Sequence, residues 1–162
     1  MIGIFCNDAG AAQLISHYVI KNPNNYIFCI TGPAKKIFNS NIITYKNFSR
    51  TKLFKKCKKI IIGCSWKKNY IINILLNAKK YEINTILYLD HWGEYGAWRK
   101  LKNGRLICPN EIWVCDKFAE KKVKKIFKKP KIIMKNNYYL ESMKKLIKKF
   151  IIKESNNKKV FT

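Results

Sequence analysis

An acid, an imidazole and several aromatic rings follow one short apolar run near the middle of the chain. The run covers residues 85–89, and the cluster directly after it comprises Asp90, His91, Trp92, Glu94 and Tyr95. A carboxylate beside an imidazole can tune a general base, and aromatic rings stack on sugars or nucleobases. We therefore expect a ligand site here. The simpler alternative is an ordinary loop, in which the rings fold onto the core and His91 makes a structural hydrogen bond.

The start of the chain shows a similar arrangement. The apolar run 2–6 leads into Asn7, Asp8 and Gly10 and then into further small residues. Small residues allow the backbone amides of a helix N-terminus to approach an anion or a sugar hydroxyl. Asp8 or Asn7 could instead cap the following helix, and capping is the simpler interpretation of Asp8, although it does not explain the small residues. The turn matches neither GxGxxG nor a P-loop, so no dinucleotide or nucleoside triphosphate site is predicted.

These two polar turns are expected to meet. In a parallel sheet the carboxyl ends of the strands lie at one edge, where ligands bind. We predict that Asp8 and His91 open into one crevice, with Trp92 or Tyr95 as a wall. Two further loops, 31–34 and 63–66, carry ordinary turn residues and support this placement only weakly. No CxxC pair and no zinc-like His spacing occurs in the sequence, so we predict no metal site.

Apolar periodicity defines the elements that position these residues. Short apolar runs predict strands at 2–6, 26–30, 42–45, 59–63, 85–89, 111–115 and 131–134. Helical spacing of apolar residues predicts helices at 11–21, 67–80, 117–128 and 139–152. The alternation predicts an α/β fold, a doubly wound and mostly parallel sheet with helices on both faces. The residues predicted to lie in or near this sheet are Ile4, Phe5, Ile61, Ile62, Leu87, Leu89, Trp113 and Val114.

The charge of the chain is strongly positive. Its 34 Lys and Arg residues against 9 Asp and Glu residues give a net charge of +25. Such a charge favours nucleic acid or an anionic membrane as partner, but a lysine-, asparagine- and isoleucine-rich composition also arises from codon bias. The lysine-rich faces of the last two predicted helices are either solvated or lie against an anionic membrane. No motif of a specific nucleic-acid module is present in the sequence.

The cysteines indicate a reducing compartment. Of the six, Cys6, Cys29, Cys64 and Cys115 lie in or just after apolar runs, where a free cysteine behaves as a small buried hydrophobe. We therefore expect free thiols and a cytosolic protein. Polar residues interrupt the first apolar stretch, so no signal peptide is predicted, and no apolar run is long enough to cross a bilayer.

The length of 162 residues predicts one domain, which we place at residues 1–153. Residues 154–162 form a polar linker that ends in the beginning of a strand, as at the start of a second domain. The alternative is a frayed polar terminus.

Four segments together resemble the N-terminal half of GT-B-type sugar enzymes. These segments are FCNDAGAAQLIS, YLDHWGEY, PNEIWVCDKFAEKKV and KNNYYLE, and the resemblance covers nearly the whole chain. The group includes bacterial polysaccharide glycosyltransferases and the related nucleotide-sugar 2-epimerases. In such enzymes two Rossmann-like domains face each other across a cleft. The N-terminal domain binds the acceptor and often contacts the membrane, and the C-terminal domain holds most of the nucleotide-sugar site.

The resemblance implies roles for the polar strand ends. Its implied acceptor-binding residues are Asn7, Asp8, Gly10, Trp92, Glu94 and Tyr95. His91 would be the catalytic residue that contacts the acceptor hydroxyl, and Asp90 would orient it. The acceptor would be a sugar or a lipid-linked sugar.

The second half of the GT-B pattern does not follow in this chain. We therefore expect an acceptor-side half in surface polysaccharide biosynthesis that is inactive without a C-terminal donor-binding half. That half is either missing from a truncated gene product or supplied by a separate partner chain. This half would bind no cofactor, and a nucleotide sugar would be the co-substrate once the partner is present. The expected location is cytoplasmic, including the inner membrane face. The rival interpretation is a non-enzymatic basic protein that binds nucleic acid or anionic membrane, and its binding would fall steeply with salt.

Overall fold

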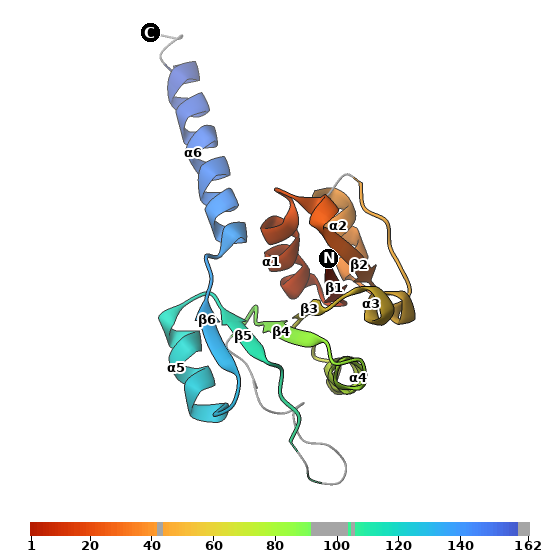
Figure 1. Ribbon diagram of the computed structural model, residues 1–162. Helices are drawn as coiled ribbons and strands as arrows, with labels where there is room; N and C mark the ends of the chain where they lie inside the picture. The colour runs from red at the N-terminus through yellow and green to blue at the C-terminus, as the bar shows by residue number, and fades with distance from the viewer. Residues whose placement is uncertain (42–43, 92–103, 105, 159–162) are drawn as a thin grey trace.

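The structure is a computed structural model that describes residues 1–41, 44–91, 104 and 106–158. Its centre is a six-stranded sheet in the order β2-β1-β3-β4-β5-β6 (Figure 1). The strands are β1 (Ile2–Cys6), β2 (Tyr26–Ile30), β3 (Lys59–Gly63), β4 (Asn84–Tyr88), β5 (Glu111–Val114) and β6 (Lys131–Met134). All neighbouring strands of this sheet run parallel, β4 and β5 included, which confirms the predicted fold class.

Helices connect the strands. They are α1 (Ala9–Val19), α2 (Ala34–Asn41), α3 (Arg50–Lys56), α4 (Lys68–Lys80), α5 (Lys117–Ile126) and α6 (Tyr138–Lys158), with a 3₁₀ turn η1 (Pro23–Asn25) before β2. Helices α1, α4 and α5 match predicted helices to within two residues at each end, and α6 begins one residue early and ends six residues late. Helices α2 and α3 were not predicted. Helix α6 continues into the segment predicted as a linker, and the strand predicted after it falls on residues outside the described part of the chain.

The sheet is covered on both faces, as a doubly wound fold requires. Side chains of α1 and α2 pack on one face together with Tyr139 of α6, and side chains of α3, α4 and α5 pack on the other. Seven of the eight residues predicted in or near the sheet lie in its strands, the eighth, Leu89, directly follows β4, and all eight are buried. Alternate residues of one strand serve opposite faces, because Ile4 belongs to the first layer and Phe5 to the second. Helix α6 extends beyond the sheet (Figure 1).

The predicted strand at 42–45 is wrong in its described half. Residues 44 and 45 form no strand, and residues 42–43 lie outside the described part. The ring of Tyr45 packs on Phe28 instead, at a centroid distance of 5.2 Å. The segment after it follows the outer edge of β2. There the Asn47 side chain accepts a hydrogen bond from the Ile30 amide at 2.8 Å and donates one to the Ile30 carbonyl at 3.0 Å.

The cysteines are free, as predicted. Cys6, Cys29, Cys57 and Cys64 are buried, which confirms the core placement of three predicted positions. Cys115 is only half-buried, because it lies just beyond the end of β5. Within the described residues, no helix has the length and apolar character needed to cross a membrane.

The strand order creates a crevice between β1 and β3. Helix α1 leaves β1 over one face of the sheet, and α4 leaves β3 over the opposite face. The loops after these adjacent strands therefore diverge. In open parallel sheets this divergence is where ligands bind.

Candidate functional site

A pocket of about 460 Å³ lies at this crevice. The loops after β1, β2, β3 and β4 all contribute to it. It is lined by Asn7, Asp8, Ala9, Gly10, Pro33, Cys64, Trp66, Lys67, Asp90 and His91. The predicted meeting of Asp8 and His91 in one crevice is therefore confirmed as a placement, while their chemical roles remain predictions.

Two larger hollows lie elsewhere. One of about 820 Å³ borders the outer edge of β2 and the start of the chain, and one of about 980 Å³ borders the amino ends of β4 and β5. Neither lies at the carboxyl ends of the strands, where parallel α/β sheets hold their ligands. The smaller pocket is therefore the candidate site.

Asp8 joins the loops after β1 and β3. It occupies the N-cap position of α1, but its side chain makes no capping hydrogen bond. Its carboxylate instead accepts hydrogen bonds from the Ser65 hydroxyl at 3.0 Å and from the Trp66 backbone amide at 2.9 Å. The prediction that Asp8 caps the helix is thus wrong, because the adjacent strand brings two other donors to the carboxylate. Asp116, by contrast, is an ordinary N-cap and accepts from the Ala119 amide at 2.7 Å.

Asn7 holds Asp8 in place through a hydrogen bond. Its side chain is buried, donates to the Asp8 carboxylate and accepts from the Thr31 hydroxyl at 3.1 Å. Gly32 packs against it with a φ of +55°, and a Cβ at Gly32 would lie only 2.7 Å from the Asn7 amide oxygen. Asn7 therefore ties the loop after β1 to the loop after β2.

Gly10 makes room for Asp90. A Cβ at Gly10 would collide with Oδ2 of Asp90, so a side chain at this position is incompatible with the observed carboxylate. Gly10 was predicted to contact substrate. In the structure Gly10 has a steric role: without a side chain at this position, the first turn of α1 lets Asp90 at the end of β4 approach closely.

Asp90 and His91 form the polar end of β4. Oδ1 of Asp90 lies 3.7 Å from Nε2 of His91, and the two side chains are 12% and 30% exposed. Burial raises the pKa of the Asp90 carboxyl above its usual range, while His91 lowers it and the charge of Asp8 raises it further. His91 is therefore not a fully buried residue, and its catalytic role and the alternative of a structural hydrogen bond both stay predictions.

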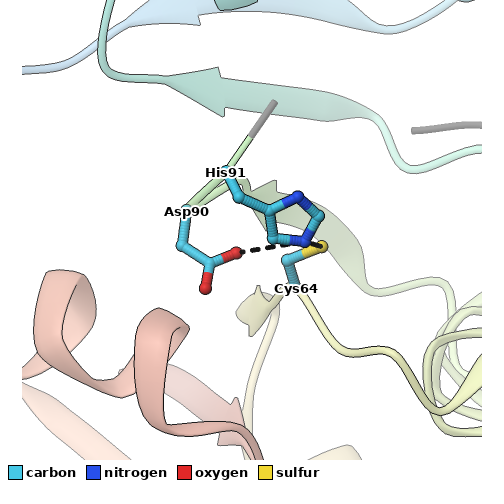
Figure 2. A group of neighbouring side chains, drawn as sticks. All are labelled: Cys64, Asp90 and His91. Atoms are coloured by element: carbon cyan, nitrogen blue, oxygen red, sulfur yellow. Dashed lines mark hydrogen bonds and ion pairs between the residues drawn. The ribbon is translucent and has the colours of Figure 1, made fainter. Parts of the chain in front are cut away.

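Cys64 and Trp66 are site residues that the sequence analysis missed. Sγ of Cys64 lies 3.8 Å from Nε2 of His91 (Figure 2). The Trp66 ring stacks on the His91 ring with centroids 4.9 Å apart and planes inclined by 6°, and the Trp66 residue is 74% exposed. Burial, followed by the charge of Asp90, raises the pKa of the Cys64 thiol to about 12, so it is protonated at neutral pH. The sequence predicts Cys64 as a core residue, and it indicates loop 63–66 only weakly as part of the site.

The remaining predicted site residues fall outside the described part of the chain. These are Trp92, Glu94 and Tyr95, so the predicted aromatic wall after β4 is not described. Trp66 from the neighbouring loop provides an aromatic face at the pocket. His17 is structural, because its Nδ1 lies 2.8 Å from the Gln13 carbonyl oxygen and its ring packs on Tyr139.

The charges of the pocket favour some ligands over others. Two carboxylates, Asp8 and Asp90, line it together with one lysine, Lys67. Carboxylates accept hydrogen bonds from hydroxyls and attract cations, whereas they repel phosphates. The pocket therefore suits a polyhydroxylated molecule or a cation better than a nucleotide.

Comparisons of the chain with protein-family models, with curated proteins and with solved structures find no match. The parallel α/β fold and the chemistry of this pocket are accordingly the basis for a functional proposal.

Proposed function

We propose that this domain is the acceptor-binding half of a GT-B-type glycosyltransferase in surface polysaccharide biosynthesis. The observation that carries the proposal is the convergence of Asp8, Asp90 and His91 in one pocket at the topological switch point of the sheet. Carboxylates and an imidazole are the groups that bind and deprotonate a sugar hydroxyl. The resemblance of four sequence segments to such enzymes agrees with this chemistry.

In the proposed reaction His91 accepts the proton of the acceptor hydroxyl. The hydroxyl oxygen attacks the anomeric carbon of the nucleotide sugar, and the bond from that carbon to the nucleotide's phosphate oxygen breaks. Asp90, next to His91, stabilises the imidazolium that forms. Asp8 accepts a hydrogen bond from a second hydroxyl of the acceptor. The exposed Trp66 ring offers an apolar face for a sugar ring.

The donor side of the reaction is assigned to a second half. The nucleotide sugar is held there as co-substrate, and this half binds the sugar or lipid-linked sugar acceptor. Two carboxylates in the pocket are consistent with this division, because they disfavour the phosphates of the donor.

Acceptor binding is the direct test. The purified chain is screened by saturation-transfer NMR against mono- and oligosaccharides and a lipid-linked sugar mimic. We expect binding that changes little with salt and is lost in His91→Ala. The control variant Lys52→Ala lies at the larger hollow beside β2 and should bind like the native protein. Equal binding by His91→Ala, or no carbohydrate binding at all, would refute the proposal.

Catalysis is tested in the presence of a donor-binding half. We expect His91→Ala to lower transfer by about 10²–10⁴-fold, the usual contribution of a general base. The thermal stability should stay within about 1 kcal/mol of the native value, because the side chain is not a core residue. Transfer at the native rate by His91→Ala would remove it from the mechanism.

The surface of α6 favours a second candidate, binding to an anionic membrane. Leu146, Ile147, Phe150 and Ile151 are exposed on this helix, and lysines occupy its other side. An amphipathic helix with lysines binds anionic lipid through both kinds of residue. Co-sedimentation with phosphatidylserine vesicles should then fall steeply with salt and should fall in Phe150→Ser. Sedimentation with neutral vesicles alone would contradict it, and salt-sensitive binding to DNA without any sugar binding would favour a nucleic-acid-binding protein.

A further inference from the structure

We propose that Cys64, Asp90 and His91 form a binding site for a transition-metal ion of the zinc class. One ligand atom from each side chain, namely the thiol sulfur, a carboxylate oxygen and an imidazole nitrogen, lies within 4.8 Å of the other two. The three side chains converge from the loops after β3 and β4 (Figure 2). Sites of this kind are not visible as a sequence motif, because the ligands come from two strands.

The distances are close to those of a metal centre. Zinc binds sulfur at about 2.3 Å and nitrogen or oxygen at about 2.0–2.2 Å, so tetrahedral ligand atoms lie roughly 3.3–3.6 Å apart. Nε2 of His91 lies 3.8 Å from Sγ of Cys64 and 3.7 Å from Oδ1 of Asp90. Movements of a few tenths of an ångström would bring these two pairs to the spacing of metal ligands. The Cys64 sulfur and the Asp90 carboxylate oxygen lie within 4.8 Å of each other and would approach further around an ion.

The chemical types of the donors select the metal. A sulfur, an imidazole nitrogen and a carboxylate oxygen suit zinc or cobalt, whereas magnesium and calcium take oxygen ligands. Ion binding requires the thiol to give up its proton, so the metal replaces the Cys64 proton.

A buried oxygen independently indicates a cation. Oδ1 of Asp90 is shielded from solvent and accepts no hydrogen bond from the residues that the structure describes. A buried carboxylate oxygen without a donor is costly, and a bound cation would compensate for that cost. Gly10 leaves the space that this carboxylate occupies, and Asp8 adds a second negative charge to the same pocket.

Three protein ligands leave the fourth position of a tetrahedral ion open. All three side chains line the pocket, so that position faces the space where a ligand would sit. An open position is the mark of a zinc ion that binds water or substrate. Metal binding is a property separate from the glycosyl transfer proposed above, and it can be measured in the absence of any sugar. On His91 the ion and the accepted proton compete for the same Nε2 lone pair.

The test is a titration of the metal-free protein with Co²⁺. We expect an equimolar complex with an intense near-ultraviolet band from sulfur-to-cobalt charge transfer, which Zn²⁺ abolishes by displacement. The Cys64→Ser variant should lose that band. Variants His91→Gln and Asp90→Asn should bind more than about 100-fold more weakly, since even groups behind the ligands change metal affinity 10–100-fold.

Matched controls use the same residue types outside the cluster. Cys115→Ser and His17→Gln should bind Co²⁺ like the native protein. Circular dichroism verifies folding, and if Cys64→Ser unfolds, His91→Gln carries the test, since its side chain is partly exposed. A Co²⁺ titration without the charge-transfer band, a band that persists in folded Cys64→Ser, or native affinity in His91→Gln would each overturn the proposal. An absence of sugar binding would refute the proposed function but would not affect the metal-binding proposal.

Discussion

Gly10 lies directly against the carboxylate of Asp90, because a Cβ at Gly10 would collide with Oδ2 of Asp90. Helix α1 begins at Ala9, so the meeting point is the first turn of that helix. β3 separates the strands that carry the two residues, and the loop after it supplies Cys64 and Trp66 at the same pocket. The absence of one methyl group thus determines where the carboxylate lies.

This close approach predicts a strong interaction between two substitutions. Gly10→Ala should destabilise the native protein by about 1–3 kcal/mol, as overpacking does. In an Asp90→Ala background the same change should stabilise by about 0.4–1 kcal/mol, because alanine restricts the unfolded chain. Urea denaturation of the four proteins of this cycle measures both values. Additive effects would show that the two residues do not compete for space.

Asp8 should be worth more than a helix cap. Asp8→Ala removes three hydrogen bonds to a charged group, from Asn7, Ser65 and Trp66, and we expect a loss of about 3 kcal/mol in the free energy of unfolding. Asp116→Ala removes an ordinary cap and should cost about 1 kcal/mol. Urea denaturation compares the two variants. Equal losses would mean that the bridge to Ser65 and Trp66 adds nothing to stability.

Trp66 should affect ligand binding far more than folding. Its ring is exposed on one side and stacked on His91 on the other. On the proposed function, Trp66→Ala should weaken sugar binding by up to about 10-fold, the equivalent of a ring-stacking contribution of 0.5–1.5 kcal/mol. Calorimetric titration measures the affinity, with Trp66→Phe as the variant that retains a ring. Undiminished affinity in Trp66→Ala would exclude the ring from the binding surface.

The cysteines should differ in reactivity. Alkylation requires the thiolate, and burial both shields Cys6 and raises its pKa. Cys108 and Cys115 are half-buried and should react first with iodoacetamide at neutral pH. Peptide mass spectrometry at successive times gives the order. Early modification of Cys6 in folded protein would contradict its placement in the core.

Alkaline pH should destabilise the fold through the same buried thiol. In the folded state the pKa of Cys6 is raised, chiefly by burial and then by the charges of Asp90 and Asp8. The unfolded chain therefore loses this proton first, and stability falls as pH rises above about 8.5, by up to about 1.4 kcal/mol per pH unit. In Cys6→Ala the slope of unfolding free energy against pH should be shallower. An unchanged slope would assign the alkaline loss to other groups.

The long periodic elements could be predicted from the sequence. Strands β1, β2, β3 and β6 coincide with apolar runs. The first three are buried, and buried parallel strands are nearly continuous in apolar residues. Helices α2 and α3 could not be predicted in this way. They contain eight and seven residues and bury only two side chains each, so their apolar periodicity is too short to recognise.

The site was predicted in part. Asp90 and His91 follow a clear strand, and their position at a ligand-binding edge follows from parallel pairing alone. The strand order does not follow from parallel pairing, and this order places β3 between β1 and β4. Cys64 therefore looked like one more small hydrophobe, although it neighbours His91 in space. The sequence feature that indicates Cys64 as a site residue is the short loop 63–66, which follows β3.

Both edges of the sheet carry features that disfavour the addition of further strands. On β2 the side-chain amide of Asn47 occupies the donor and acceptor of Ile30. At the opposite border β6 has only four residues, starts with Lys131 after Pro130 and precedes Lys135. Open strand edges are templates for aggregation, and short, lysine-flanked or covered edges prevent it. We therefore expect this isoleucine-rich sheet to resist polymerisation through its strand edges.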